Sequence, residues 1–149
     1  MTPLIGLLLT LWGLVGAHTT VYQLDQPVQF TDLYGTERVA DAALGCAPGN
    51  RAALWVGPDA DLETIVHELA HAYDCIDNGV MDASPTLRPI ARPQWVSDYC
   101  WLSDAEWYAC SVMRYGTIEP HEVAPWGPAA VAAAGDAWPT GATLGPPPR

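Results

Sequence analysis

Lysine is absent from this chain of 149 residues, and its six basic residues are all arginines. With 17 acidic residues, the formal net charge is −11. Six arginines among 17 acidic residues cannot form a basic patch of the kind that binds nucleic acid or an anionic membrane surface. We therefore expect neither nucleic acid nor a membrane surface as a partner. The chain also lacks a long apolar run. Residues 4–17 would span about 21 Å as a helix, short of the ~30 Å core of a bilayer.

That apolar run is typical of a secretory signal peptide over residues 1–17. Val15-Gly16-Ala17 places small or short side chains where a signal peptidase cuts, which predicts cleavage after Ala17. The residues before the run, Met1-Thr2-Pro3, include no basic side chain, so an uncleaved anchor and a buried core helix remain alternatives. Cleavage predicts a secreted or extracytoplasmic protein without a stable membrane span.

The cysteines favour the same location. Four of them lie beyond the predicted signal: Cys46, Cys75, Cys100 and Cys110. An even number in a small exported chain predicts two disulfides, for which three pairings are possible.

The most specific pattern in the chain is His67-Glu68-Leu69-Ala70-His71. Asp61 is a good helix N-cap, apolar residues follow at helical spacing, and Asn78-Gly79 ends the segment, so the pattern is expected on a helix. Residues four apart share a helix face, so both imidazoles can reach one metal ion. Glu68 beside them can take a proton from a metal-bound water. Two surface histidines on an amphipathic helix are the alternative.

A zinc site needs a third protein ligand. Asp77, six residues past the second histidine, could reach the ion only if the helix turned sharply before it, and Asp74 is a poor helix breaker. Glu106 is the stronger candidate because it opens a second helix, expected from about Ser103 to Tyr115. The alternative role for Glu106 is a capping box with Ser103, three residues earlier.

A later Glu-x-x-Ala, formed by Glu106 and Ala109, accompanies the first motif. In this the chain resembles the minimal gluzincins, which pair His-Glu-x-x-His with a glutamate on a second helix. The resemblance covers residues 51–116 and implies a zinc metallopeptidase, a hydrolase acting on a peptide or protein substrate. It further implies Zn²⁺ ligation by His67, His71 and Glu106, with Glu68 as the catalytic base. A non-catalytic, zinc-stabilised extracellular binding domain is the alternative function.

The resemblance carries further expectations. The two helices of gluzincins run roughly antiparallel at the metal, which implies that Cys75 and Cys110 diverge and do not pair. The other two pairings stay open. Zincins also add a donor for the oxyanion, for which Tyr99, Tyr108, Tyr115 and His121 are candidates.

Asp74 is a further candidate at the site. It lies one turn past His71 on the same helix face, where its carboxylate could accept the outer N–H of a ligating imidazole. The alternative is a solvated acid or a charge in the second turn of the helix.

The expected fold is α+β, a small zincin-like domain with a short antiparallel sheet, an active-site helix and a second, glutamate-bearing helix. Residues 52–56 read as the best strand, 19–33 as one or two short strands, and 36–44 as a short helix with Thr36 as cap and Gly45 as stop. The expected division is a signal peptide at 1–17, a metallopeptidase domain at 18–118 and a Pro-, Gly- and Ala-rich tail at 119–149.

Overall fold

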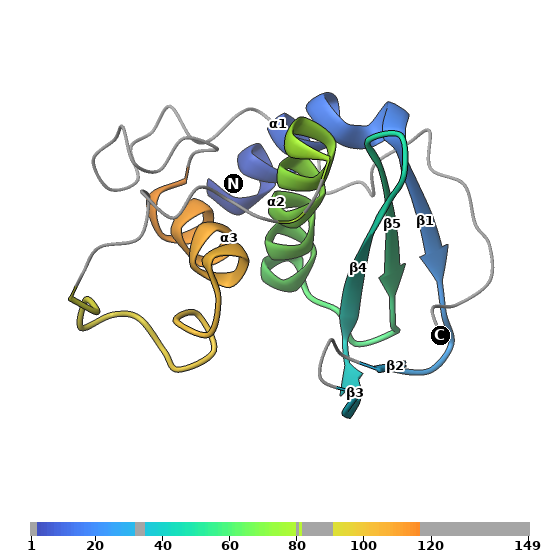
Figure 1. Cartoon of the computed structure of the whole chain (residues 1–149). Coiled ribbons are helices and arrows are strands. Elements are labelled where there is room, and N and C mark those ends of the chain that lie inside the picture. Colours follow the sequence, from blue (N-terminus) through green and yellow to red (C-terminus); the bar gives the residue numbers. More distant parts are fainter. Residues whose placement is uncertain (1–2, 32–34, 80, 82–90, 117–149) are drawn as a thin grey trace.

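The computed structural model describes residues 3–31, 35–79, 81 and 91–116 of the chain. Within this part, three α-helices, a short 3-10 helix and five strands form an α+β fold (Figure 1). In chain order the elements are α1 (Pro3–Val15), η1 (Gly16–His18), β1 (Thr19–Gln23), β2 (Val28–Thr31), β3 (Glu37–Ala40), β4 (Ala42–Ala47), β5 (Arg51–Val56), α2 (Leu62–Asn78) and α3 (Asp104–Tyr115). The expected tail over 119–149 lies outside the described residues.

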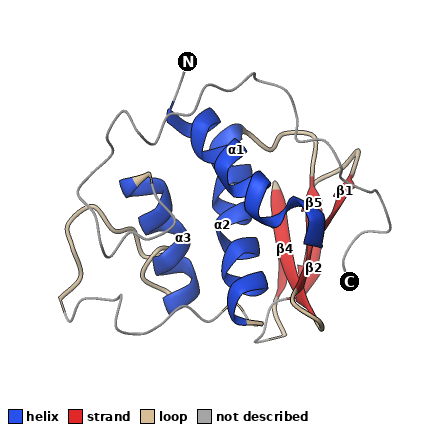
Figure 2. Ribbon diagram, turned by 90° about the horizontal axis from the view of Figure 1, so that it is seen from above, coloured by secondary structure: helices blue, strands red, loops and turns tan. Residues whose placement is uncertain are grey.

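Helix α2 is the centre of the fold. It lies between the sheet and α3 in both views, and α1 packs against it (Figure 1, Figure 2). Its apolar face, with Ile65, Val66 and Leu69, shares one buried cluster with Leu54 and Val56 of β5. Side chains on α2 are therefore held in place by contacts with all the surrounding elements.

The main sheet is mixed, with the strand order β1-β5-β4. β4 and β5 pair antiparallel as expected, but β1 lies parallel to β5, so the expectation of an antiparallel sheet is only partly right. Between β1 and β4 the chain makes a separate antiparallel pair, β2 with β3. It then returns along β4 and turns once more into β5, which gives β5 the direction of β1. β4 is left as an edge strand of this sheet.

The short helix expected over residues 36–44 is wrong, because this segment forms β3 and the first part of β4. Ala42 pairs with Val56 across the antiparallel ladder, so the neighbouring strand satisfies the backbone groups that a helix would have paired locally. Gly45 belongs to β4 and does not stop a helix. A Cβ at Gly45 would lie 3.0 Å from the Trp55 ring, so the glycine makes room for that indole on the sheet.

The limits of α2 are set by local signals that the sequence predicts correctly. The Asp61 Oδ1 atom accepts the Thr64 N–H at 2.8 Å and satisfies one of the free donors at the helix start. Gly79 ends the helix in the left-handed region, at φ 82°, and its N–H donates to the Cys75 carbonyl at 2.7 Å. The 17 residues between these caps are continuously helical.

The apolar N-terminal segment forms α1, which packs against α2 with Leu7, Leu11 and Val15 buried. The Thr19 hydroxyl donates to the Val15 carbonyl at 2.8 Å and joins the helix end to β1. In the structure α1 is therefore a helix that packs in the core, which is one of the alternatives for this segment. Removal of residues 1–17 as a signal peptide stays a prediction. Across the described ranges, none of the helices combines the length and hydropathy needed to cross a bilayer.

Two disulfides join Cys46 to Cys75 and Cys100 to Cys110, with Cα atoms 5.6 and 5.8 Å apart. The prediction of two bridges is confirmed, and the pairing is one of the two that the sequence left open. The first bridge ties β4 to the end of α2. The second ties the segment before α3 to the middle of α3. Disulfides persist in oxidising surroundings, so the pair suggests an extracellular environment.

Candidate metal centre

Two side chains of the candidate metal centre come from consecutive turns of α2. The ring centroids of His67 and His71 lie 4.9 Å apart in an edge-to-face arrangement. His71 is buried, and the His67 side chain is 15% exposed. The spacing of four residues thus brings both imidazoles to one face of α2, as the sequence predicts.

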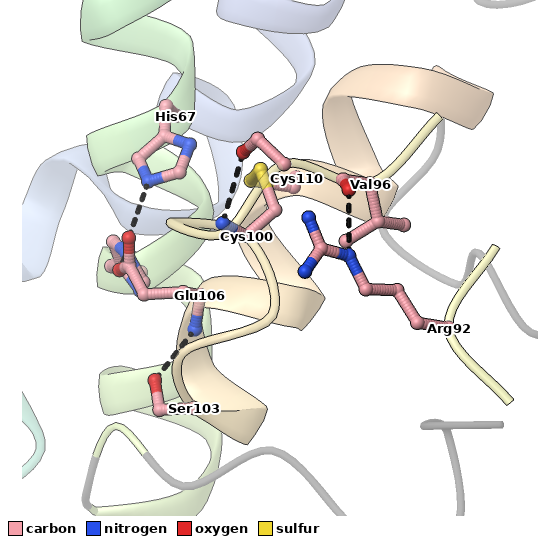
Figure 3. Close-up of a disulfide and its surroundings, with 9 residues drawn as sticks. His67, Arg92, Val96, Cys100, Ser103, Glu106 and Cys110 are labelled. Carbon is pink, nitrogen blue, oxygen red and sulfur yellow. Dashed lines mark hydrogen bonds and ion pairs between the residues drawn. A yellow bond between two sulfur atoms is a disulfide. The ribbon is translucent and has the colours of Figure 1, made fainter. Parts of the chain in front are cut away.

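The third side chain, Glu106, comes from the first turn of α3. Its Oε1 lies 2.5 Å from His71 Nε2. Its Oε2 lies 3.4 Å from His67 Nε2, the pair joined by a dashed line in Figure 3. One ligand atom from each of the three residues lies within 4.8 Å of the other two. The two helices therefore place two nitrogen donors and one carboxylate oxygen around a common point.

The chemistry of this donor set fits a metal ion. Zinc lies about 2.0–2.2 Å from imidazole nitrogen and carboxylate oxygen, so tetrahedral ligand atoms are roughly 3.3 Å apart. The observed spacing reaches that arrangement with small side-chain movements. In addition, His67 Nε2 and Glu106 Oε2 are buried without a well-aligned hydrogen bond to any described group. Such atoms cost about 1–3 kcal/mol each, and coordination to an ion would satisfy both.

The Glu106 carboxylate is directed at the histidines and does not complete a capping box. Ser103 Oγ accepts the Glu106 backbone N–H at 3.1 Å, so the serine caps α3 through the main chain of Glu106 (Figure 3). The side chain is left available for the metal centre. Asp77, the competing candidate, is exposed near the end of the unbroken helix α2 and is not part of the three-residue group.

The charges at the centre favour a Glu106–His71 ion pair. Burial alone would raise the pKa of Glu106. Hydrogen bonds and charges from His67 and His71 outweigh burial, so this pKa lies well below its usual range. Burial acts to lower the pKa of His71, yet the hydrogen bond to Glu106 and the charges of Glu68, Glu106 and Asp74 raise it above its usual value. The proton on His71 thus occupies the place that a metal ion would take.

Glu68 lies beside this group and faces a cleft of about 860 Å³. The lining comes from the three α-helices, the β3–β4 junction and the segment before α3: Leu4, Ala40, Asp41, Ala42, Glu63, Thr64, His67, Glu68, Trp95, Tyr99, Cys100, Cys110, Met113 and Arg114. The pKa of Glu68 is raised above its usual value, chiefly by burial and to a lesser degree by the charge of Glu106. The charges of His71 and His67 act in the opposite direction but do not outweigh burial. A raised pKa makes a carboxylate a better proton acceptor than an ordinary glutamate.

Of the four candidate oxyanion donors, the structure brings Tyr99 to the centre. Its ring centroid lies 6.0 Å from that of His67, and it lines the cleft. Tyr108 is buried in the core, and Tyr115 packs edge-to-face on Trp95. His121 lies outside the described residues.

Asp74 is buried, which excludes the solvated acid considered from the sequence. It is 2% exposed, and its Oδ1 accepts a hydrogen bond from Asn78 Nδ2 at 2.5 Å. Its charge contributes to the raised pKa of His71, and His71 Nδ1 is buried without a hydrogen bond from the described residues. A carboxylate in this place suits the role of orienting a ligating imidazole.

Sequence reasoning missed the two walls of the cleft. Met113 and Arg114 lie two turns past Glu106, and the Arg114 guanidinium lies over the Trp95 ring at 5.5 Å. Helical spacing from Glu106 could have found them. The opposite wall, at Asp41, could not be found because it depends on how β4 pairs with β5.

The chain matches no family model, no curated protein and no solved structure in the comparisons with known proteins. The site itself therefore defines what class of protein this is. It is an α+β protein with a His67, His71 and Glu106 group that could bind a metal ion.

Proposed function

We propose that the chain is an exported zinc-dependent peptidase of the gluzincin type. The observation that carries the proposal is the convergence of His67, His71 and Glu106, next to a cleft that His67 and Glu68 line. Three protein ligands facing an open cleft are typical of catalytic zinc sites, whereas structural sites are closed by four. Zinc is the metal that this mixture of imidazole and carboxylate favours.

Zinc bound here would supply Lewis acidity, which lowers the pKa of water and polarises a carbonyl oxygen. Side chains of the protein would carry out the proton transfers. Glu68 follows His67 directly on α2 and lines the cleft, so its carboxylate takes the proton of the attacking water and later returns it to the leaving amine. Its raised pKa favours the first of these transfers.

A peptide is the substrate that the walls of the cleft suit best. β4 is an edge strand of the sheet, and Ala42 at its start lines the cleft. An extended peptide could pair its main chain with such an edge and pass the metal ligands. The acidic net charge of −11 favours neutral or basic substrates.

The disulfides support an oxidising location, and export through the predicted signal over residues 1–17 completes the proposal. The alternative is a zinc-stabilised binding domain without activity. A cleft lined by Glu68, which is not one of the three candidate ligands, argues against it, since a structural site has no use for a base.

The test compares three proteins: the parent chain, Glu68→Gln and Glu63→Gln. Glu63 is the matched control because it also lines the cleft, one turn before His67 on the same helix. We measure bound zinc by elemental analysis and cleavage of a fluorescently labelled unfolded protein. Glu68→Gln should keep zinc and lose about 10²–10⁴-fold in turnover, while Glu63→Gln keeps both. Zinc with no cleavage by the parent chain would favour the binding-domain alternative.

A further inference from the structure

Tyr99 lies on a turn that is stiffened by its own hydrogen bonds. The Ser97 Oγ accepts the Cys100 N–H at 3.2 Å, and the Ser97 carbonyl accepts the Trp101 N–H at 3.1 Å. The Tyr99 carbonyl accepts the Leu102 N–H at 3.2 Å. The backbone on both sides of Tyr99 is therefore fixed locally.

The Cys100–Cys110 disulfide then fixes this turn to the helix that carries Glu106. Cys110 lies one turn past Glu106 on α3, and the bridge stands beside the pair of Glu106 and His67 (Figure 3). Tyr99, next in sequence to Cys100, reaches over His67 with ring centroids 6.0 Å apart. Although Tyr99 is 56% exposed, burial is the largest cause that raises its pKa, and the charge of Glu106 and hydrogen bonding to it come next. The hydroxyl therefore lies within hydrogen-bonding reach of the Glu106 carboxylate, on the side where the ring meets His67.

Glu106 needs such a partner once a metal is bound. In the metal-free protein its two oxygens contact Nε2 of His71 and of His67. In the metal-bound protein those nitrogens are ligands and cannot donate hydrogen bonds. The carboxylate then loses both contacts from α2, and an outer donor is required to hold its orientation.

We propose that Tyr99 is a positioning residue for the metal centre: its hydroxyl, fixed to α3 through the Cys100–Cys110 disulfide, donates to Glu106 and holds that carboxylate in its ligating orientation. This inference rests on the proposed zinc centre. It differs from an oxyanion role, in which the hydroxyl would donate to substrate and leave metal binding untouched. Groups that orient metal ligands typically change affinity by 10–100-fold when removed.

The test uses zinc alone as the probe, with affinity measured by competition with a chelating dye in the full oxidised chain. Tyr99→Phe removes only the hydroxyl and should weaken zinc binding about tenfold, with the melting temperature of the metal-free protein unchanged. Tyr22→Phe is the matched control. Tyr22 stacks on Trp55 with ring centroids 5.2 Å apart, outside the cleft, and the same change there should leave affinity as in the parent.

A second variant, Cys100→Ala with Cys110→Ala, keeps all three ligands and Tyr99 but frees the turn. This double variant should also weaken zinc binding. Adding Tyr99→Phe to the double variant should change the zinc affinity by less than about twofold, because both changes remove the same hydrogen bond from the Tyr99 hydroxyl to Glu106. Additive losses would overturn the role given to the disulfide.

Unchanged zinc affinity in Tyr99→Phe overturns the inference, and a fall in kcat at unchanged affinity would assign the hydroxyl to the substrate. Both results leave the zinc centre intact. Failure of the parent chain to bind zinc is a separate result, because it removes the proposed function and this inference with it.

Discussion

Replacing Glu106 by alanine is the sharpest test of the metal centre. The change removes one of the three proposed ligands but leaves the cap of α3 intact, because Ser103 Oγ accepts the backbone N–H of residue 106 and does not contact its side chain. We expect zinc affinity to fall by at least about tenfold, as for loss of other groups that define a metal site. Asp77→Ala, at an exposed position of α2, should leave affinity nearly intact.

The loss can be read from thermal stability. Zinc at about one hundred times its Kd stabilises the parent by about 2.7 kcal/mol, and a tenfold weaker site reduces this to about 1.4 kcal/mol. For a domain of roughly 100 residues the difference of about 1.3 kcal/mol corresponds to roughly 5–10 °C in Tm. Melting curves with and without zinc, recorded for both variants and the parent, measure it directly.

Ser103→Ala separates the ligand role from the cap. It should cost about 1 kcal/mol of stability with or without zinc, since it removes the hydroxyl that caps α3, and should not change the zinc-induced shift. The assignment of Glu106 fails if Glu106→Ala behaves like Ser103→Ala, or if Asp77→Ala alone loses the zinc-induced shift.

Two further predictions concern stability. In the metal-free protein the pKa of Glu106 is lowered, so its stabilising contribution is present above the unfolded value of about 4.3 and is lost as the pH falls through the folded value. The pKa of His71 is raised, so its contribution is present below about 6.5 and is lost as the pH rises through the folded value. Melts in chelator across this range should therefore peak in mildly acidic solution, and a peak above neutral pH would contradict the ion pair. Cys46→Ala with Cys75→Ala opens a loop with a sequence separation of 29 and should lower the free energy of unfolding by about 3–4 kcal/mol. Urea unfolding measures this, and four titratable thiols in the native oxidised protein would refute the bridges.

The parts of the fold that the sequence predicts are those set by neighbours in the chain. Asp61 and Gly79 limit α2 through contacts within four residues, and Gly116 ends α3 at φ 68° in the same way. The segment 36–44 is predicted wrongly because its state depends on two partner strands, β2 and β5, that local propensity does not contain. The disulfide pairing stays open for the same reason, since it depends on the packing of distant elements.

The same distinction between local and distant contacts decides which parts of the candidate site the sequence predicts. The spacing of His67 and His71 alone puts both imidazoles on one face, so any helix over this segment gives the pair. The choice of Tyr99 among three tyrosines and a histidine needs the turn before α3 and its disulfide, and neither has a signature in the sequence. The position of Asp74 is predictable from spacing, but its burial follows from the packing of α2.

The proposed metal centre is shared by two helices, so it requires a fixed distance between them. Ala70, next to His71 on α2, and Ala109, one turn past Glu106 on α3, are both fully buried in the same core cluster. Small side chains at these positions let the helices approach closely enough for a carboxylate, one of the shorter ligands, to reach the histidines. Each helix is also tied by one disulfide, α2 to β4 and α3 to the turn of Tyr99. The core and the bridges thus set the separation that the three ligands need before any ion is bound, which is the condition for a preorganised site.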